Sequence, residues 1–120
     1  MTTIVYTTKG LSIMHIKTVE LNNYRGYENI KVEFQPGLNL VIGNNGAGKS
    51  SLLAGTRAIL EELFESTGGL TKLTHFEKSD IRISSQKIGD TTYAYQRNYP
   101  MYVECELAYN DDVLNIRVGY

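Results

Sequence analysis

The feature that most constrains the fold is a glycine-rich loop in the first half of the chain. Residues 43–50 read GNNGAGKS and satisfy the pattern G-x-x-x-x-G-K-[ST] in full. An apolar run, residues 38–42, comes directly before the loop, and an amphipathic segment comes directly after it. Strand, loop and helix in this order form the unit in which such a loop cradles phosphates. The sequence therefore predicts a phosphate-binding loop of the Walker A type.

Each residue type in this loop suits a polyphosphate that carries a metal ion. Backbone N–H groups can approach such a ligand closely only where side chains are small. The helix that follows adds unpaired N–H groups and the positive end of its dipole. Lys49 can reach the outer phosphates, and the Ser50 hydroxyl is a hard oxygen ligand for Mg²⁺. We therefore expect a nucleotide polyphosphate with Mg²⁺, and Ser50 as the metal ligand; the loop alone does not choose between ATP and GTP. The expected binding residues are Gly43, Asn44, Asn45, Gly46, Ala47, Gly48, Lys49 and Ser50.

Hydrophobic periodicity outlines the other elements. Residues 14–24 predict a strand, residues 30–35 alternate as a half-buried strand does, and residues 38–42 are apolar enough for a strand covered on both faces. The strong helical period covers residues 49–65, followed by a plausible stop at residues 67–69. One stripe of that helix should face the core, and it consists of Leu52, Thr56, Ile59, Leu60 and Leu63.

Period-two alternation returns in the last third of the chain. Residues 91–98, 101–109 and 113–120 predict strands, and the last two should form a hairpin around a short polar turn. Cys105 falls on the apolar face of its strand, so we expect a buried structural thiol and not a nucleophile. Five tyrosines follow the same alternation, which favours packing within the sheet over stacking on nucleic acid. They are Tyr93, Tyr95, Tyr99, Tyr102 and Tyr109.

Composition narrows the setting in which the chain works. The 120 residues carry twelve basic and thirteen acidic side chains, so the net charge of −1 does not point to nucleic acid or to a membrane surface. No apolar stretch approaches the ~20 residues of a membrane span, and the N-terminus has no secretion signal. The single cysteine fits a reducing compartment. We expect a soluble cytoplasmic protein with no membrane partner.

Three sequence elements together resemble a known family. They are the strand end NNYRGYEN at residues 22–29, the PGLN turn at residues 36–39, and the NGAGKSSLL form of the loop itself. In these features the chain is similar to the N-terminal lobe of RecF/SMC-type ATPases, AAA-family P-loop proteins that share the ABC-type head. Within this group it looks closest to bacterial phage-defence proteins of the overcoming-lysogenisation (OLD-like) type. Their DIR and YP elements resemble SDIRI at residues 79–83 and NYPMYVECEL at residues 98–107.

The resemblance implies a fold and adds two site residues. The implied fold class is α/β, a P-loop NTPase N-terminal lobe with a mixed β-sheet, an antiparallel β-subdomain and one main helix after the phosphate loop. Residues 1–13 would be an N-terminal extension and residues 14–120 the lobe. Ser51 would support the α-phosphate, and Asn45 would lie near the γ-phosphate. Arg25 would approach the nucleotide, although a solvated arginine in a turn is an equally good interpretation.

Two parts of a complete ATPase of this family are not found in the sequence. No apolar strand ends in Asp-Glu, as a Walker B element would, and no LSGGQ-like signature is present. The resemblance implies that the complete protein hydrolyses ATP in DNA repair or anti-phage defence, with DNA and a partner nuclease as possible partners. This chain alone should be inactive and should need a second copy or the remaining C-terminal lobe.

Two other functions stay open at this point. The chain could be a truncated module that binds nucleotide or docks onto a partner and never hydrolyses. It could also belong to another P-loop class such as the small GTPases, although the N-K-x-D segment that reads guanine is absent. Apolar strands without their neighbours should make the isolated chain self-associate.

Overall fold

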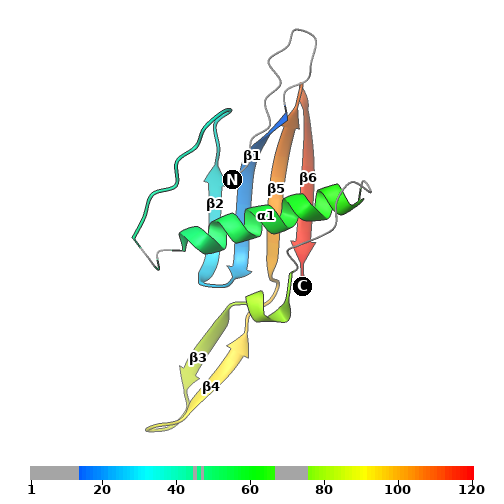
Figure 1. The fold of residues 1–120 in the computed structure, drawn as a ribbon. Coiled ribbons are helices and arrows are strands. Elements are labelled where there is room, and N and C mark those ends of the chain that lie inside the picture. The colour runs from blue at the N-terminus through cyan, green and yellow to red at the C-terminus, as the bar shows by residue number, and fades with distance from the viewer. Residues whose placement is uncertain (1–13, 45, 47, 67–75) are drawn as a thin grey trace.

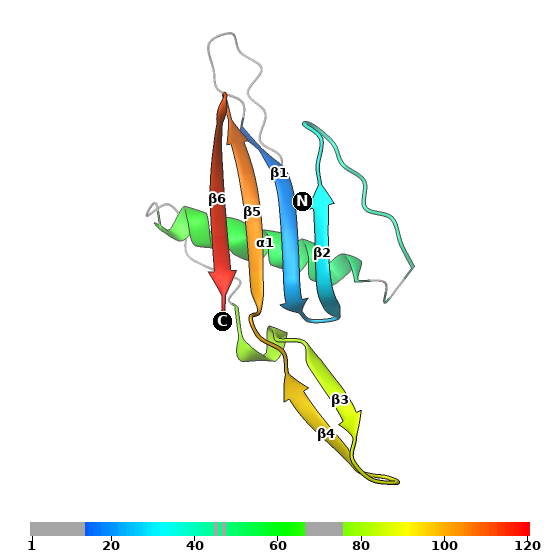
Figure 2. The same cartoon turned by 180° about the vertical axis from the view of Figure 1, so that it is seen from behind.

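The structure, a computed structural model, describes residues 14–44, 46, 48–66 and 76–120. Four strands form an antiparallel sheet in the order β2-β1-β5-β6, and β3 pairs with β4 in a separate hairpin. One helix, α1, crosses one face of the four-stranded sheet (Figures 1 and 2). The elements in chain order are β1 Met14–Tyr24, β2 Tyr27–Glu33, α1 Lys49–Ser66, the short 3₁₀ helix η1 Lys78–Asp80, β3 Ile83–Lys87, β4 Tyr93–Arg97, β5 Tyr102–Tyr109 and β6 Asp112–Gly119.

The predicted antiparallel layer and the single main helix are confirmed. The helix begins at the predicted residue and ends at Ser66, while the predicted stop at residues 67–69 and the predicted extension at residues 1–13 lie outside the described residues. Every strand pair among the described residues is antiparallel, so they do not form the parallel part of the predicted mixed sheet.

The prediction of a buried strand over residues 38–42 is wrong for this structure. The segment is an extended loop between β2 and α1 (Figure 1), and no described strand pairs with it. Leu38 is 96% exposed, Leu40 80% and Ile42 83%. An apolar run becomes a strand only where another strand completes its hydrogen-bond ladder. Instead, the Asn39 side chain closes the preceding turn through hydrogen bonds to the backbone of Gln35.

The core lies between α1 and the sheet. Val19, Leu21, Val103 and Cys105 are fully buried on the face that α1 covers. The predicted helix stripe is confirmed, with Leu52, Thr56 and Ile59 buried and Leu60 and Leu63 packed at its edge.

Gly55 marks the closest approach of α1 to the sheet. A Cβ at Gly55 would lie 2.8 Å from Leu21 Cδ2 and 3.5 Å from Val103 Cγ2. Its lack of a side chain, which weakens an isolated helix, therefore lets this helix pack closely.

Cys105 is buried, as predicted, and burial raises the pKa of its thiol to about 12, with a smaller contribution from the charge of Glu106. We expect the folded protein at pH 8 to resist Ellman's reagent and to react fully in guanidinium chloride. The unfolded thiol ionises near pH 9.0. Between about pH 9 and 12 the unfolded state therefore loses a proton that the folded state keeps, and stability should fall by about 1.4 kcal/mol per pH unit.

Alkaline denaturation of Cys105→Ala checks this origin. In the variant, the free energy of unfolding should fall less steeply with pH, because the contribution of one proton is gone. The fall that remains comes from groups such as Tyr24, whose burial raises its pKa to about 12. An unchanged slope in Cys105→Ala, or rapid reaction of the folded wild-type thiol, would contradict the buried assignment.

The exposed segment 38–42 gives a second prediction. Three neighbouring apolar side chains, Leu38, Leu40 and Ile42, are left in water, so the isolated chain should self-associate as its concentration rises. Replacing all three by glutamine should reduce association in sedimentation velocity without changing the thermal melt. Val41 provides the control, because it packs against the core and Val41→Gln should lower stability instead. A wild-type monomer at every concentration would contradict the prediction.

Candidate functional site

The start of α1 and the loop before it surround a hollow of about 380 Å³. The first hydrogen bond of the helix runs from Leu52 N to Gly48 O at 3.0 Å, so Gly48 precedes the helix and the first-turn N–H groups have no partner within it. Gly46 and Gly48 have φ angles of +85° and +92°, a region that glycine adopts easily. The hollow is lined by Gly26, Gly46, Gly48, Lys49, Ser50 and Ser51.

The positive charge at this site comes from the loop lysine and the helix start. Lys49 Nζ donates a hydrogen bond to the Gly43 carbonyl oxygen, so the side chain reaches back from the end of the loop to its beginning. The first turn of α1 contains no acidic residue. The positive end of the helix dipole therefore faces the hollow without a carboxylate of that turn to offset it.

The structure brings part of the predicted site together. Four predicted residues besides Gly46 line the hollow, namely Gly48, Lys49, Ser50 and Ser51. The Gly43 carbonyl oxygen accepts the hydrogen bond from Lys49 Nζ, whereas Asn44 is an exposed residue of the loop. Two further predicted residues, Asn45 and Ala47, lie outside the described residues.

Ser50 fits the role of a metal ligand for a phosphate-bound ion. It is exposed in the first turn of α1 and lines the hollow. Among the described residues no three His, Cys, Asp or Glu side chains cluster as a metal site. Mg²⁺ at this loop would therefore depend on one hydroxyl, water and the phosphates, which is how this ion is usually held at nucleotides.

Tyr27 packs beside the site at Gly48, a contact that the sequence did not reveal. It begins β2, directly after the turn that contributes Gly26 to the hollow. A Cβ at Gly48 would lie 2.3 Å from the Tyr27 hydroxyl oxygen and 2.6 Å from Cζ of its ring. The ring therefore occupies the space that any larger residue at Gly48 would need. An aromatic residue just after the turn was the available signal, but the contact joins residues far apart in sequence.

Arg25 is held by Asp80 in this structure. Its Nε donates to Asp80 Oδ1 at 2.9 Å, and its backbone N donates to the Asp80 carbonyl oxygen at 2.6 Å. Burial disfavours the charged guanidinium, but the hydrogen bond to Asp80 and the nearby Tyr24 and Asp80 charges outweigh this and raise the pKa of Arg25 above its ordinary value. The hollow is lined by its neighbour Gly26 and not by Arg25. The role of Arg25 at the nucleotide stays a prediction.

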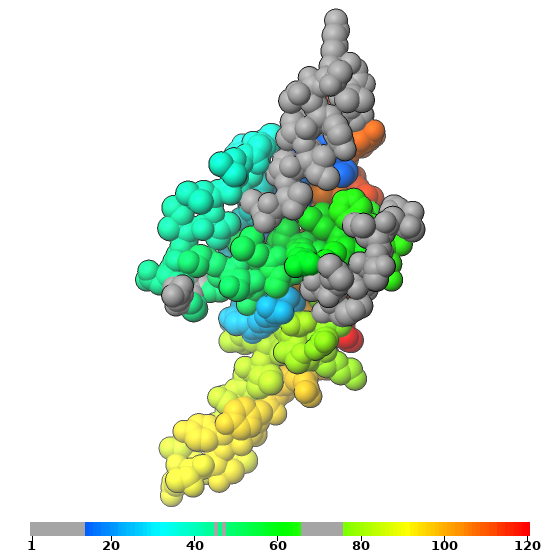
Figure 3. Space-filling model, in the orientation of Figure 1, coloured from blue at the N-terminus to red at the C-terminus, as the bar shows by residue number. Residues whose placement is uncertain are grey.

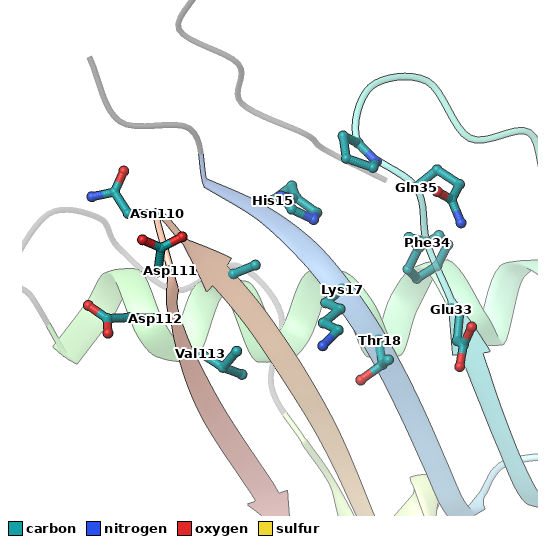
Figure 4. Close-up of a pocket in the computed structure, with 12 residues that line it drawn as sticks. His15, Lys17, Thr18, Glu33, Phe34, Gln35, Asn110, Asp111, Asp112 and Val113 are labelled. Atoms are coloured by element: carbon teal, nitrogen blue, oxygen red, sulfur yellow. The ribbon is translucent and has the colours of Figure 1, made fainter. Parts of the chain in front are cut away.

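A second, larger hollow lies on the sheet face opposite α1 (Figure 4). Its volume is about 450 Å³, and its walls come from the start of β1, the end of β2 and the β5–β6 turn. His15 and Lys17 line this hollow together with three acidic residues, Glu33, Asp111 and Asp112. This mixed lining contains no helix N-terminus, so it suits a polyphosphate less well than the hollow at α1.

Comparison with models of known protein families shows which family this chain belongs to. The model of the AAA ATPase domain matches residues 14–113, which include the loop, α1 and most of the sheet. The chain belongs to the AAA ATPase domain family. It is therefore a member of a nucleotide-binding ATPase family. Among the described residues of this AAA ATPase domain, no helix has both the length and the apolar character needed to cross a membrane.

Curated relatives of this AAA ATPase domain include proteins named DNA replication and repair protein RecF. The RecF of Streptococcus agalactiae is 35% identical over 75 residues, covering 62% of this chain and 20% of the relative. That of Lactococcus lactis is 30% identical over 71 residues, covering 59% and 20%. That of Listeria monocytogenes is 45% identical over 40 residues, covering 33% and 11%. The chain thus spans a fifth or less of the length of these relatives, and no solved structure matches it.

Proposed function

We propose that the chain binds Mg-ATP through a Walker A loop, residues 43–50, as the N-terminal lobe of a RecF-like ATPase. The observation that carries the proposal is the hollow at the start of α1, where Gly46, Gly48 and Lys49 meet Ser50 and Ser51. N–H groups with no partner within the helix, the positive end of the helix dipole and a lysine converge there on one small volume. This combination suits a negatively charged triphosphate better than it suits an uncharged ligand.

The residues of the hollow divide the work by their chemistry. Backbone N–H groups of Gly48, Lys49 and Ser50 would bind phosphate oxygens, and the Lys49 ammonium would move from the Gly43 carbonyl to the outer phosphates. The Ser51 hydroxyl would support the α-phosphate. The Ser50 hydroxyl would hold Mg²⁺, which neutralises phosphate charge when bound.

In this proposal, ATP hydrolysis and any action on DNA belong to a complete protein. The proposed setting is the cytoplasm, in DNA repair or anti-phage defence, with a second copy or a C-terminal lobe, DNA and a nuclease as partners. The relatives named for DNA replication and repair support the repair role. The exposed segment 38–42 specifically favours a second candidate, a module that docks onto a partner without turnover, because three apolar side chains there lack a covering surface.

Isothermal titration calorimetry of the whole chain tests nucleotide binding. We expect heat on adding ATP with Mg²⁺, weaker binding when EDTA removes the ion, and poor competition by GTP. In Ser50→Ala the affinity for ATP should no longer depend on Mg²⁺, while the fold is unchanged because Ser50 is exposed. No heat with any nucleotide, both for the chain alone and with a C-terminal lobe supplied, would refute the proposal.

A further inference from the structure

The β3–β4 hairpin forms an arm that no other described element covers. In the space-filling view its yellow and olive atoms project away from the body of the molecule (Figure 3). Every residue of both strands is exposed except Ser84, which is half-buried. The arm is nevertheless fixed at its base, because Arg82 N donates to the Asn23 carbonyl oxygen and Asn98 N donates to that of Arg82. An anchored hairpin with two open faces can offer one of them to a ligand.

One face of this arm combines aromatic rings with positive charge. In the strand register Lys87 lies opposite Tyr93, and Ser85 lies opposite Tyr95. Opposite residues project on the same side of a sheet, as do residues two apart along one strand. Tyr93, Tyr95, Lys87 and Arg97 therefore share a face, here called the tyrosine face. Tyr93 is 51% exposed and Tyr95 74%, so the prediction that these two tyrosines pack within the sheet is wrong.

The charge on this arm differs from that of the chain as a whole. Strands β3 and β4 contain two cations, Lys87 and Arg97, and no Asp or Glu. Asp90 in the turn that joins the strands leaves the hairpin with a net charge of +1, whereas the net charge of the chain is −1. The two tyrosines are about 7 Å apart along the strand, since each residue rises about 3.4 Å. Two ring platforms between two cations suit a ligand with repeating planar groups and repeating negative charges.

We propose that the tyrosine face binds single-stranded nucleic acid, with bases stacked on Tyr93 and Tyr95 and phosphates held by Lys87 and Arg97. A duplex keeps its bases paired and offers no free ring surface to these tyrosines. Tyrosine and arginine are also common at protein interfaces, but lysine is depleted at the centres of such interfaces. The face also has one aliphatic side chain, Ile83, so these features favour nucleic acid, and a protein partner is left as an outcome of the test. The proposal does not rest on ATP binding.

Fluorescence anisotropy of the whole chain with a labelled oligothymidylate tests this surface. We expect the double variant Tyr93→Ala/Tyr95→Ala to weaken binding at least about tenfold, and Tyr93→Phe/Tyr95→Phe to keep it, since phenylalanine retains the stacking ring. Lys87→Gln/Arg97→Gln should reduce the slope of log affinity against log salt by about 1.4. Gln86→Ala/Gln96→Ala, on the opposite face of the same strands, is the matched control and should bind normally.

Several outcomes would overturn the proposal. They are no binding by the wild type, unchanged binding by the tyrosine-to-alanine variant, and equal affinity for a duplex of the same length. If that variant lowers self-association in sedimentation but leaves oligonucleotide binding unchanged, the face is an interface between copies and the proposal is wrong. Lys49→Ala should bind the oligonucleotide normally, which separates this result from a failure of nucleotide binding. Circular dichroism should show the same melt for all hairpin variants, because their side chains lie outside the core.

Discussion

Replacing Lys49 by alanine should weaken Mg-ATP binding about 100-fold, measured by calorimetry on the whole chain. Among the described residues, Lys49 is the one charged side chain that lines the hollow at α1. A hydrogen bond to a charged group contributes about 1.5–3 kcal/mol, or roughly 10- to 150-fold in affinity. The upper half of that range applies because a triphosphate concentrates negative charge at the end of the lysine side chain. The neighbouring N–H groups cannot replace a mobile cation.

Two controls make the Lys49 result specific. Lys31→Ala removes an exposed lysine of β2 that is not part of the lining and should leave ATP affinity unchanged. The Lys49 hydrogen bond to Gly43 is also lost in the variant, so its melt should shift by no more than about 1 kcal/mol of stability. Undiminished ATP affinity in a folded Lys49→Ala protein would refute the Walker A assignment.

The sequence predicted α1 and the β5–β6 hairpin because their signals are local. A helical period over residues 49–65 and strict alternation over residues 101–109 need only neighbours along the chain. The same reasoning set the start of β2 three residues too late, at Ile30, whereas the strand begins at Tyr27. The actual turn holds only Arg25 and Gly26, and Tyr24 already pairs with Tyr27.

Hydrophobicity states which residues favour burial but not whether a covering surface is present. Leu38, Leu40 and Ile42 form a strand-like run by pattern, yet no described strand meets them. Tyr93 and Tyr95 alternate as strand residues do, and they do lie on a strand, but both faces of that strand are open. Hydrophobic periodicity identifies which residues share one face of a strand, but it does not show whether another element covers that face.

The candidate site shows the same division between local and distant information. The loop and the helix start follow from adjacent residues, and the motif identified them. The ion pair of Arg25 joins residues 55 apart in sequence, and the contact of Tyr27 with Gly48 joins two different elements. Neither contact has a pattern along the chain, so only the folded arrangement reveals them.

Replacing Gly48 by alanine should damage the site more than the same change at the other glycines of positive φ. At Gly48 an added Cβ meets the Tyr27 ring at 2.3–3.0 Å and must also adopt a φ of +92°. Backbone strain of about 1–2 kcal/mol and overpacking of about 1–3 kcal/mol should together lower stability and move the loop. We expect the affinity for Mg-ATP to fall at least about tenfold.

Gly37 and Gly46 separate the two causes. Their φ angles are +89° and +85°, and an added Cβ at either would meet no atom of the described residues within 4 Å. Gly37→Ala and Gly46→Ala should therefore show only the strain cost in a urea melt, and Gly37→Ala should bind ATP normally because Gly37 lies outside the hollow. Adding Tyr27→Ala to Gly48→Ala removes the obstructing ring, so the double variant should regain the overpacking part of the lost stability but not the strain. If Gly48→Ala costs no more than Gly46→Ala, or if removing Tyr27 restores nothing, then the tyrosine does not hold the loop against β2, and the shape of the phosphate cradle must come from the loop and helix alone.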